Sequence, residues 1–398
     1  KTLSKLEPTD MFTDDASKRI AEVERKELGR IEKESWYERF AYIQDDESYF
    51  DLQDRREISR QTFNALFRHI ECKSIHSGRK VEASVCFDEN RQAMGAKALV
   101  GITYAAGEDM LVARDGDLYG NRWRDARPEC SPGDITPWMK HCQTLVPEPD
   151  ELNHLLDVMA FKVQHPEVKI NHAVLHAGDQ GSGKDTMWAP FIWAVCGEHM
   201  KNHGLLDNDT MSSQFGYALE SEILILNELK EPDARERRAL ANKLKPIIAA
   251  PPEMLTVNRK GLHPYQMANR VFVLAFSNDP VPISLDSQDR RWFCVWSDSA
   301  KMTPDEAQRI WNWYHAGGFE IVADWLDRRD VSAFNPGAIP PMTEASTGLV
   351  APAARPRTMP ASMAARISFE RDGSTGVYMT ITASVSSAPR SVSTAVRY

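Results

Sequence analysis

The sequence predicts an α/β protein with a central parallel sheet, preceded by a smaller α+β domain. Three short apolar runs, each about the length of one buried strand, support the parallel sheet: His172–Ala177, Glu222–Leu226 and Val271–Phe276. A continuous apolar run of this length is typical of a strand covered on both faces. Polar residues follow each run directly, and segments with helical spacing lie between them, so we expect strands and helices to alternate along this part of the chain.

The first strand leads into the segment Gly178–Lys184, which has the pattern G-x-x-x-x-G-K. This pattern binds nucleotide phosphates when a strand precedes it and a helix follows, and residues 186–198 have the apolar spacing of such a helix. Backbone N–H groups, the lysine charge and the helix N-terminus would together attract the phosphates. The alternative is a glycine-rich turn without a ligand. The residues expected to hold the nucleotide, ATP, are Gly178, Gly181, Ser182, Gly183, Lys184, Asp185 and Thr186.

The second strand delivers Asn227 and Glu228 to its carboxyl end, where open α/β sheets place their ligands. Glu228 is the candidate to orient and deprotonate an attacking water. The alternative is a surface acid just beyond a core strand.

Two positions depart from the usual magnesium ligands of a phosphate loop. Asp185 replaces the usual Ser or Thr, and Asn227 replaces the usual acidic residue. Together they still provide one carboxylate and one neutral oxygen, so we hypothesise a charge-conserving exchange in which Asp185 and Asn227 bind Mg²⁺. Thr186 is an alternative source of a hydroxyl, and a weakened site that binds ATP without hydrolysing it is the rival interpretation.

A basic segment follows the second strand. Arg259, Lys260 and His263 surround Gly261, which marks a tight turn, and prolines flank the segment. At the tip of a hairpin these side chains would reach a DNA backbone. The alternative is a solvated loop.

The third strand ends in Ser277-Asn278, and an amide at this point can sense the terminal phosphate and position water. Arg290 and Arg291 come next, directly before the apolar strand Phe293–Trp296. One of them would act across a subunit boundary as an arginine finger. Structural ion pairs to Asp286 or Asp289 are the competing explanation.

In order and spacing, these motifs resemble those of superfamily 3 helicases, particularly the ATPase domain of D5-like phage and plasmid primase-helicases. The resemblance covers most of residues 35–345 and implies an AAA+-like ATPase domain. It also implies a ring, usually hexameric, that threads one strand of single-stranded or forked DNA through a central channel and unwinds duplex with ATP and Mg²⁺. In such a ring Lys184 would bind phosphate, Glu228 would activate water, Lys260 would line the channel, Asn278 would act as sensor, and Arg290 or Arg291 would complete a neighbour's site.

Composition agrees with a local DNA site. The net charge of -9 argues against a protein that coats nucleic acid over its whole surface, whereas a ring multiplies one modest basic loop. The six cysteines lack a C-x-x-C pair, so neither a disulfide framework nor a zinc ribbon is expected. The sequence contains no apolar stretch long enough for a membrane span, and we expect a cytoplasmic location.

The chain divides into five segments. Residues 1–34 form a charged helical linker, 35–147 the accessory domain, 148–300 the ATPase domain, 301–345 a helical lid, and 346–398 a largely disordered tail. Between residues 351 and 398 the tail carries six arginines against two acids, and a shifted reading frame is an alternative origin for it. Lys1 is not a methionine, which suggests an excerpt or a processed chain that could lack an upstream polymerase or primase region.

We therefore interpret the chain as an ATP-dependent DNA helicase in the replication of a phage, prophage or plasmid. One alternative is a P-loop kinase acting on a small phosphate acceptor, which would not require Asn278 or the arginine pair. Another is a nucleotide-gated DNA-binding module with little hydrolysis.

Overall fold

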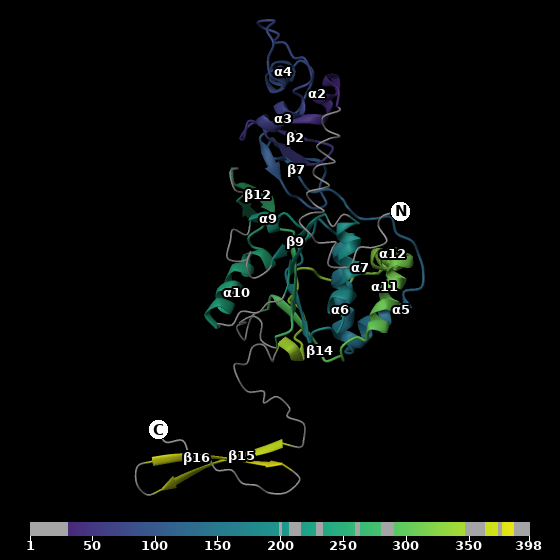
Figure 1. Ribbon diagram of the computed structural model, residues 1–398, viewed down its shortest axis with the longest axis vertical. Coiled ribbons are helices and arrows are strands. Elements are labelled where there is room, and N and C mark those ends of the chain that lie inside the picture. Colours follow the sequence, from purple (N-terminus) through teal and green to yellow (C-terminus); the bar gives the residue numbers. More distant parts are fainter. Residues whose placement is uncertain are drawn as a thin grey trace.

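A computed structural model describes residues 31–198, 201–206, 216–227, 234–258, 263–279, 290–346, 363–372 and 376–385. Figure 1 shows an accessory domain at one end, a larger central domain around a parallel sheet, and a pair of strands beyond it. The predicted fold class is therefore confirmed. Residues 1–30 of the expected linker lie outside the described residues.

Five parallel strands form the central sheet, in the spatial order β14-β8-β13-β10-β9. Their bounds are Ala173–Gly178 (β8), His203–Leu206 (β9), Ile223–Leu226 (β10), Phe272–Ser277 (β13) and Trp292–Ser297 (β14). Numbered along the chain, the order is fifth, first, fourth, third, second. The first strand, β8, therefore lies inside the sheet, between β13 and β14.

Helices cover both faces of this sheet. On one face pack α5, α6, α7, α11 and α12, with bounds Thr136–Leu145, Pro149–Gln164, Lys184–Cys196, Pro304–Trp313 and Phe319–Arg328. Side chains of α10 (Ala234–Ile248), the short α9 (Gly216–Leu219) and the hairpin β11–β12 (Met254–Val257 and Tyr265–Ala268) contribute to the other core. The expected boundary at residue 148 falls after α5, yet Trp138 of α5 is fully buried in the core of the central domain.

Side chains that point alternately to the two faces of the sheet explain why each strand is a continuous apolar run in the sequence. In β10, Ile223 and Ile225 belong to the core on one face, and Leu224 and Leu226 belong to the core on the other. Since successive side chains point to opposite faces of a sheet, burial on both sides requires every position to be apolar.

The C-terminal segment expected as a helical lid contains two helices, α11 and α12, with a break between them. A short turn, η3 (Tyr314–Gly318), separates α11 from α12, and Gly317 within it has φ 107°. Glycine adopts this left-handed conformation without a steric penalty, so it ends the first helix. Periodicity alone does not reveal such a break, because the apolar positions continue on both sides of it.

The accessory domain contains two small sheets with short helices. The first sheet has the order β3-β2-β1-β4 and the second β5-β7-β6. The strands are Phe40–Ile43, Ser48–Asp51, Arg56–Ile58, Ala98–Leu99, Gly101–Thr103, Leu111–Arg114 and Asp117–Asn121, numbered β1 to β7. The helical elements are η2 (Lys33–Ser35), α2 (Trp36–Arg39), α3 (Arg60–Leu66) and α4 (Ala83–Asn90).

Aromatic packing holds the accessory domain together. Trp36, Phe63 and Phe67 are fully buried against one another, with ring centroids 4.7–5.4 Å apart. Ser59 caps α3 by accepting a hydrogen bond from the N–H of Thr62. Trp36, Trp123 and Trp138 are all buried, so these residues pack in the core and do not offer their rings to bases.

Five of the six cysteines are buried, and Cys130 is exposed. Within the tail that was expected to be disordered, the structure has an antiparallel strand pair, β15 (Met363–Asp372) and β16 (Gly376–Val385), which lies away from the rest of the molecule in Figure 1. None of the described helices combines the length and apolar character that crossing a bilayer requires.

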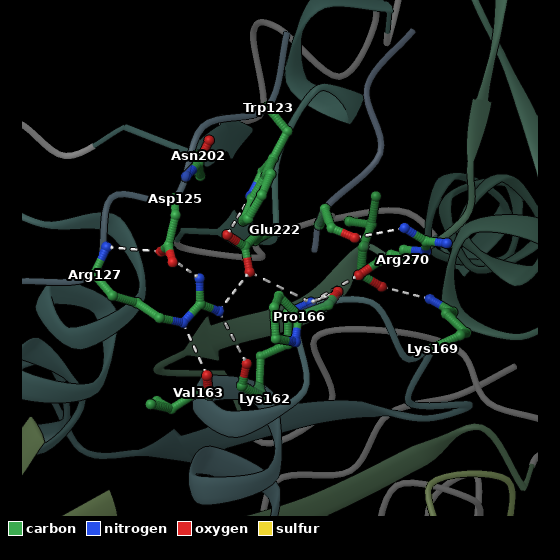
Figure 2. A network of polar contacts seen from close by, with 12 residues as sticks. Trp123, Asp125, Arg127, Lys162, Val163, Pro166, Lys169, Asn202, Glu222 and Arg270 are labelled. Atoms are coloured by element: carbon green, nitrogen blue, oxygen red, sulfur yellow. Dashed lines mark hydrogen bonds and ion pairs between the residues drawn. The ribbon is translucent and has the colours of Figure 1, made fainter. Parts of the chain in front are cut away.

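A buried charge cluster joins the chain leaving the accessory domain to the amino edge of the central sheet (Figure 2). Glu222, just before β10, is fully buried and accepts hydrogen bonds from Trp123 Nε1 at 2.7 Å and from the Arg127 guanidinium at 3.0 Å. Lys162 Nζ lies 3.8 Å from the same carboxylate and donates to the carbonyl oxygen of Arg270. Burial lowers the pKa of Lys162 to about 8, and the charge of Glu222 opposes this shift.

Replacing Glu222 with glutamine should destabilise the protein by about 3–5 kcal/mol, because it leaves the buried Lys162 without its anion and Arg127 with only the exposed Asp125. Urea unfolding at neutral pH measures this. The matched control is Glu71→Gln, which breaks an exposed pair with Lys73 and should cost less than about 1 kcal/mol. Equal costs for the two variants would show that the cluster does not stabilise the fold.

Candidate functional site

The glycine-rich loop lies between β8 and α7, as the motif requires. β8 ends at Gly178 and α7 begins at Lys184. Gly178 has φ 148° and Gly183 has φ 93°. A Cβ at Gly178 would come within 2.5 Å of the Ser297 carbonyl oxygen, so both the conformation and the close approach favour glycine there.

The ammonium of Lys184 lies inside the loop. It donates hydrogen bonds to the carbonyl oxygens of Gly178 and Asp179, each at 2.9 Å, and to Asn278 Oδ1 at 3.1 Å. Burial lowers the pKa of Lys184, and the neighbouring Asp185 opposes the shift. The bond to Asn278 brings together two residues that lie far apart in the sequence and that were selected from separate motifs.

The order of the strands in the sheet explains why Lys184 and Asn278 lie close together. β13 is hydrogen-bonded directly to β8, with Ser277 opposite Ala177, and β10 is the next strand along. Because the strands are parallel, Asn278 and Asn227 follow their carboxyl ends at the same edge as the loop. Asn227 is exposed there, and Glu228 lies outside the described residues.

The three hydroxyl or carboxyl candidates on the loop differ in accessibility. Asp185, in the first turn of α7, is exposed, whereas Ser182 and Thr186 are buried. Of the two candidate metal ligands on α7, the structure therefore leaves Asp185 facing solvent. Mg²⁺ binds through one or two protein oxygens together with phosphates and waters, and one carboxylate with one amide fits that requirement. No cluster of three or more His, Cys, Asp or Glu side chains suited to a metal occurs in the described part of the chain.

Two residues that the sequence interpretation missed hold the loop from outside. The Nε2 of His141, on α5, lies 2.9 Å from the Gly183 carbonyl oxygen, and the Met302 N–H donates to the Gly181 carbonyl oxygen at 2.9 Å. Burial lowers the pKa of His141, so the ring is neutral and Nε2 is the donor to this carbonyl. Neither residue belongs to a recognisable motif, and only the folding of α5 and of the segment after β14 brings them to the loop.

A chain of buried hydrogen bonds fixes the strand beneath the loop. Trp188 Nε1 donates to His176 Nδ1 at 2.8 Å, so the hydrogen of this ring is on Nε2, which lies 2.8 Å from Ser297 Oγ. Ser297 Oγ in turn donates to the Leu145 carbonyl oxygen at 2.7 Å. Burial and the positive charge of Lys184 lower the pKa of His176 to about 3, which keeps the ring neutral. These bonds connect α7, β8, β14 and α5.

Arg290 and Arg291 lie at the opposite edge of the sheet. They precede the amino end of β14, and the Arg291 carbonyl oxygen accepts the Ala173 N–H at the start of β8. A strand of this length spans about 20 Å, so neither backbone position is near the glycine-rich loop of the same chain. Asp286 and Asp289, the proposed ion-pair partners, lie outside the described residues.

The segments on either side of the predicted basic turn form the antiparallel pair β11–β12. Arg259 and Lys260 lie outside the described residues. His263 is exposed, with its N–H 3.5 Å from Asp46 Oδ1 in the accessory domain. Thr103 Oγ1 also donates to the Gln266 carbonyl oxygen at 3.1 Å, so the accessory domain supports the base of this hairpin.

If the loop binds ATP as its motif predicts, replacing His141 with alanine should weaken that binding about fivefold to thirtyfold, because a hydrogen bond to the loop contributes about 1–2 kcal/mol and its loss frees the Gly183 peptide. Titration with a fluorescent ATP analogue measures the dissociation constant. Lys140→Ala, an exposed neighbour on α5, is the matched control. Unchanged affinity in the His141 variant would mean that this contact does not shape the loop.

Comparison with known proteins finds a matching family and a similar phage protein. Residues 176–291 match DUF5906, a family of unknown function. Over 135 residues the chain is 27% identical to the DNA primase-polymerase of Nitratiruptor phage NrS-1, a match that covers 34% of this chain and 18% of that protein.

Solved structures of the same phage protein show the likeness of fold. An apo structure of the NrS-1 C-terminal region (305–718) has a TM-score of 0.61 at 19% identity, covering 78% of this chain and 71% of that one. A second apo form has a TM-score of 0.60 at 18% identity, with coverage of 78% and 71%. The chain is thus similar in sequence to a short part of a phage primase-polymerase, and similar in fold to its C-terminal region.

Proposed function

We propose that this chain is an ATP-dependent DNA helicase of the superfamily 3 type, acting in the replication of a phage, prophage or plasmid. The observation that carries the proposal is the 3.1 Å bond between Lys184 and Asn278, which unites the glycine-rich loop with the end of the neighbouring strand. A phosphate-binding lysine and a polar sensor are thereby within reach of one terminal phosphate.

In this proposal each residue has one role. ATP binds against the loop, and its phosphates replace the carbonyl oxygens as partners of Lys184. Asp185 and Asn227 would hold Mg²⁺, which supplies positive charge to the phosphates. Glu228 takes a proton from the attacking water, and Asn278 senses the γ-phosphate.

The position of the arginine pair favours a ring. Arg290 and Arg291 are at the sheet edge opposite to their own loop, so they would assist hydrolysis only at the site of another copy. A closed assembly, proposed here as a hexamer, provides such a neighbour for every site. In that ring Arg259, Lys260 and His263 would contact single-stranded DNA in the channel, with the accessory domain supporting the hairpin.

The decisive test is phosphate release by the intact chain, with and without single-stranded DNA. We expect DNA to stimulate release in the parent, and Lys184→Ala to lower it at least about tenfold, since charge-assisted phosphate contacts are strong. Lys97→Ala, an exposed lysine of the accessory domain, is the control. Transfer of phosphate to a small acceptor would indicate a kinase instead, and DNA binding gated by ATP without release would indicate a binding module.

The metal hypothesis has its own test. Asp185→Asn should raise the Mg²⁺ concentration required for half-maximal phosphate release about tenfold or more, because it removes the proposed anionic ligand. Asp179→Asn removes the same charge from an exposed position on the same loop and serves as the control. Undiminished turnover of the Asp185 variant at low Mg²⁺ would eliminate the exchange of roles between Asp185 and Asn227.

A further inference from the structure

A compact basic turn projects from the accessory domain, between α3 and α4. Residues 73–80, here called the basic turn, contain Lys73, Arg79 and Lys80 and no acidic residue, which gives a local charge of +3 in a chain of net charge -9. Apart from Ser74, every residue of the turn is exposed. Residues 73–80 are therefore positively charged, whereas the chain as a whole carries an excess of negative charge.

Hydrogen bonds give the basic turn a defined shape. Backbone bonds join Ser74 N–H to the Arg79 carbonyl oxygen and Gly78 N–H to the Ser74 carbonyl oxygen, each at 2.9 Å. Lys73 and Lys80 face each other in an antiparallel bridge. The closed loop thus holds Lys73 opposite Lys80, with Arg79 next to Lys80 in the chain, and less backbone entropy is lost when a ligand binds such a loop.

The turn is also fixed to the body of the domain. Glu89 of α4 accepts hydrogen bonds from Ser74 Oγ at 2.8 Å and from the Ile75 N–H at 2.9 Å. These bonds lower the pKa of Glu89 and keep it ionised. Cys72, directly before the turn, is buried in the aromatic core of the accessory domain. The Glu89 carboxylate therefore holds the backbone of the basic turn in place.

The tip of the turn combines this charge with apolar surface. The Ile75 side chain is 57% exposed. Lys73 forms an exposed pair with Glu71 at 3.5 Å, a type of contact that contributes little stability and exchanges readily for another anion. No ion pair involves Arg79 or Lys80 within the described ranges.

We propose that the basic turn is a second DNA-binding site, which contacts the sugar-phosphate backbone without reading sequence. The inference rests on the proposed function, because it supposes that the chain acts on DNA. Clustered cations attract phosphates independently of base sequence, and Ile75 offers apolar surface to a sugar or an unstacked base. The accessory domain would then hold DNA at a place separate from the β11–β12 hairpin, on the same nucleic acid.

The test compares two charge-matched variants of the full chain. In the first, Arg79→Gln and Lys80→Gln remove two charges from the basic turn. In the second, Arg309→Gln and Arg328→Gln remove two charges from exposed positions on α11 and α12. Affinity for a labelled forked DNA of arbitrary sequence is measured without nucleotide and with ATP over a range of salt concentrations, and urea unfolding confirms that both variants are folded.

We expect the turn variant to bind about tenfold or more weakly than the parent near 100 mM salt. Its log–log salt slope should be smaller by about 1.4–1.8, since each phosphate contact contributes about 0.7 on single strands and about 0.9 on duplex. The second variant should retain most of the parental affinity and slope.

Two results would overturn the proposal, and they are distinguishable. If the parent binds DNA and the turn variant matches it in affinity and salt slope, the second site is refuted while the proposed helicase function remains. If the two charge variants lose affinity equally, the effect is one of overall charge and the turn is likewise refuted. Absence of DNA binding by the parent, with or without ATP, would refute the proposed function and the second site together.

Discussion

Parallel alignment of five strands, each covered on both faces, is the constraint on which the rest of the structure depends. It places the carboxyl ends of all five strands at one edge of the sheet. Residues from motifs that lie far apart along the chain therefore meet at that edge. The bond between Lys184 and Asn278 is a direct result of β13 lying beside β8. The buried bonds of His176 then fix β8 to the helix that follows the loop and to β14.

The edge of the sheet at the carboxyl ends of the strands and the edge at their amino ends carry different groups. The carboxyl edge carries the exposed polar groups proposed to handle phosphate and metal. The amino edge carries the buried Glu222 and Lys162 together with the partly exposed Arg127, and their paired charges join the accessory domain to the sheet. Arg290 and Arg291 also lie at the amino edge, so a role for them in hydrolysis requires a second copy. The geometry thus connects the proposed chemistry to assembly.

Much of the central domain could be predicted from local pattern. The apolar runs gave β8, β10, β13 and β14 to within about two residues at each end, because burial on both faces imposes a simple rule on composition. The loop between β8 and α7 was predictable because phosphate binding requires glycines at fixed spacing. The break at Gly317 and the placement of α5 with the central domain were not, since both depend on partners distant in the chain.

By itself, the sequence determined which residues are proposed to handle a nucleotide: Lys184, Asp185, Asn227 and Asn278 were selected from strand ends and one loop. The tertiary structure alone decided which of them meet, that Asp185 is accessible and Thr186 is buried, and that His141 and Met302 hold the loop. The physical reason is that a motif depends on the residue types that one short segment requires. Strand order and packing across the sheet determine which other residues lie next to that segment. Residues such as His141, which act only through that packing, leave no pattern in the sequence.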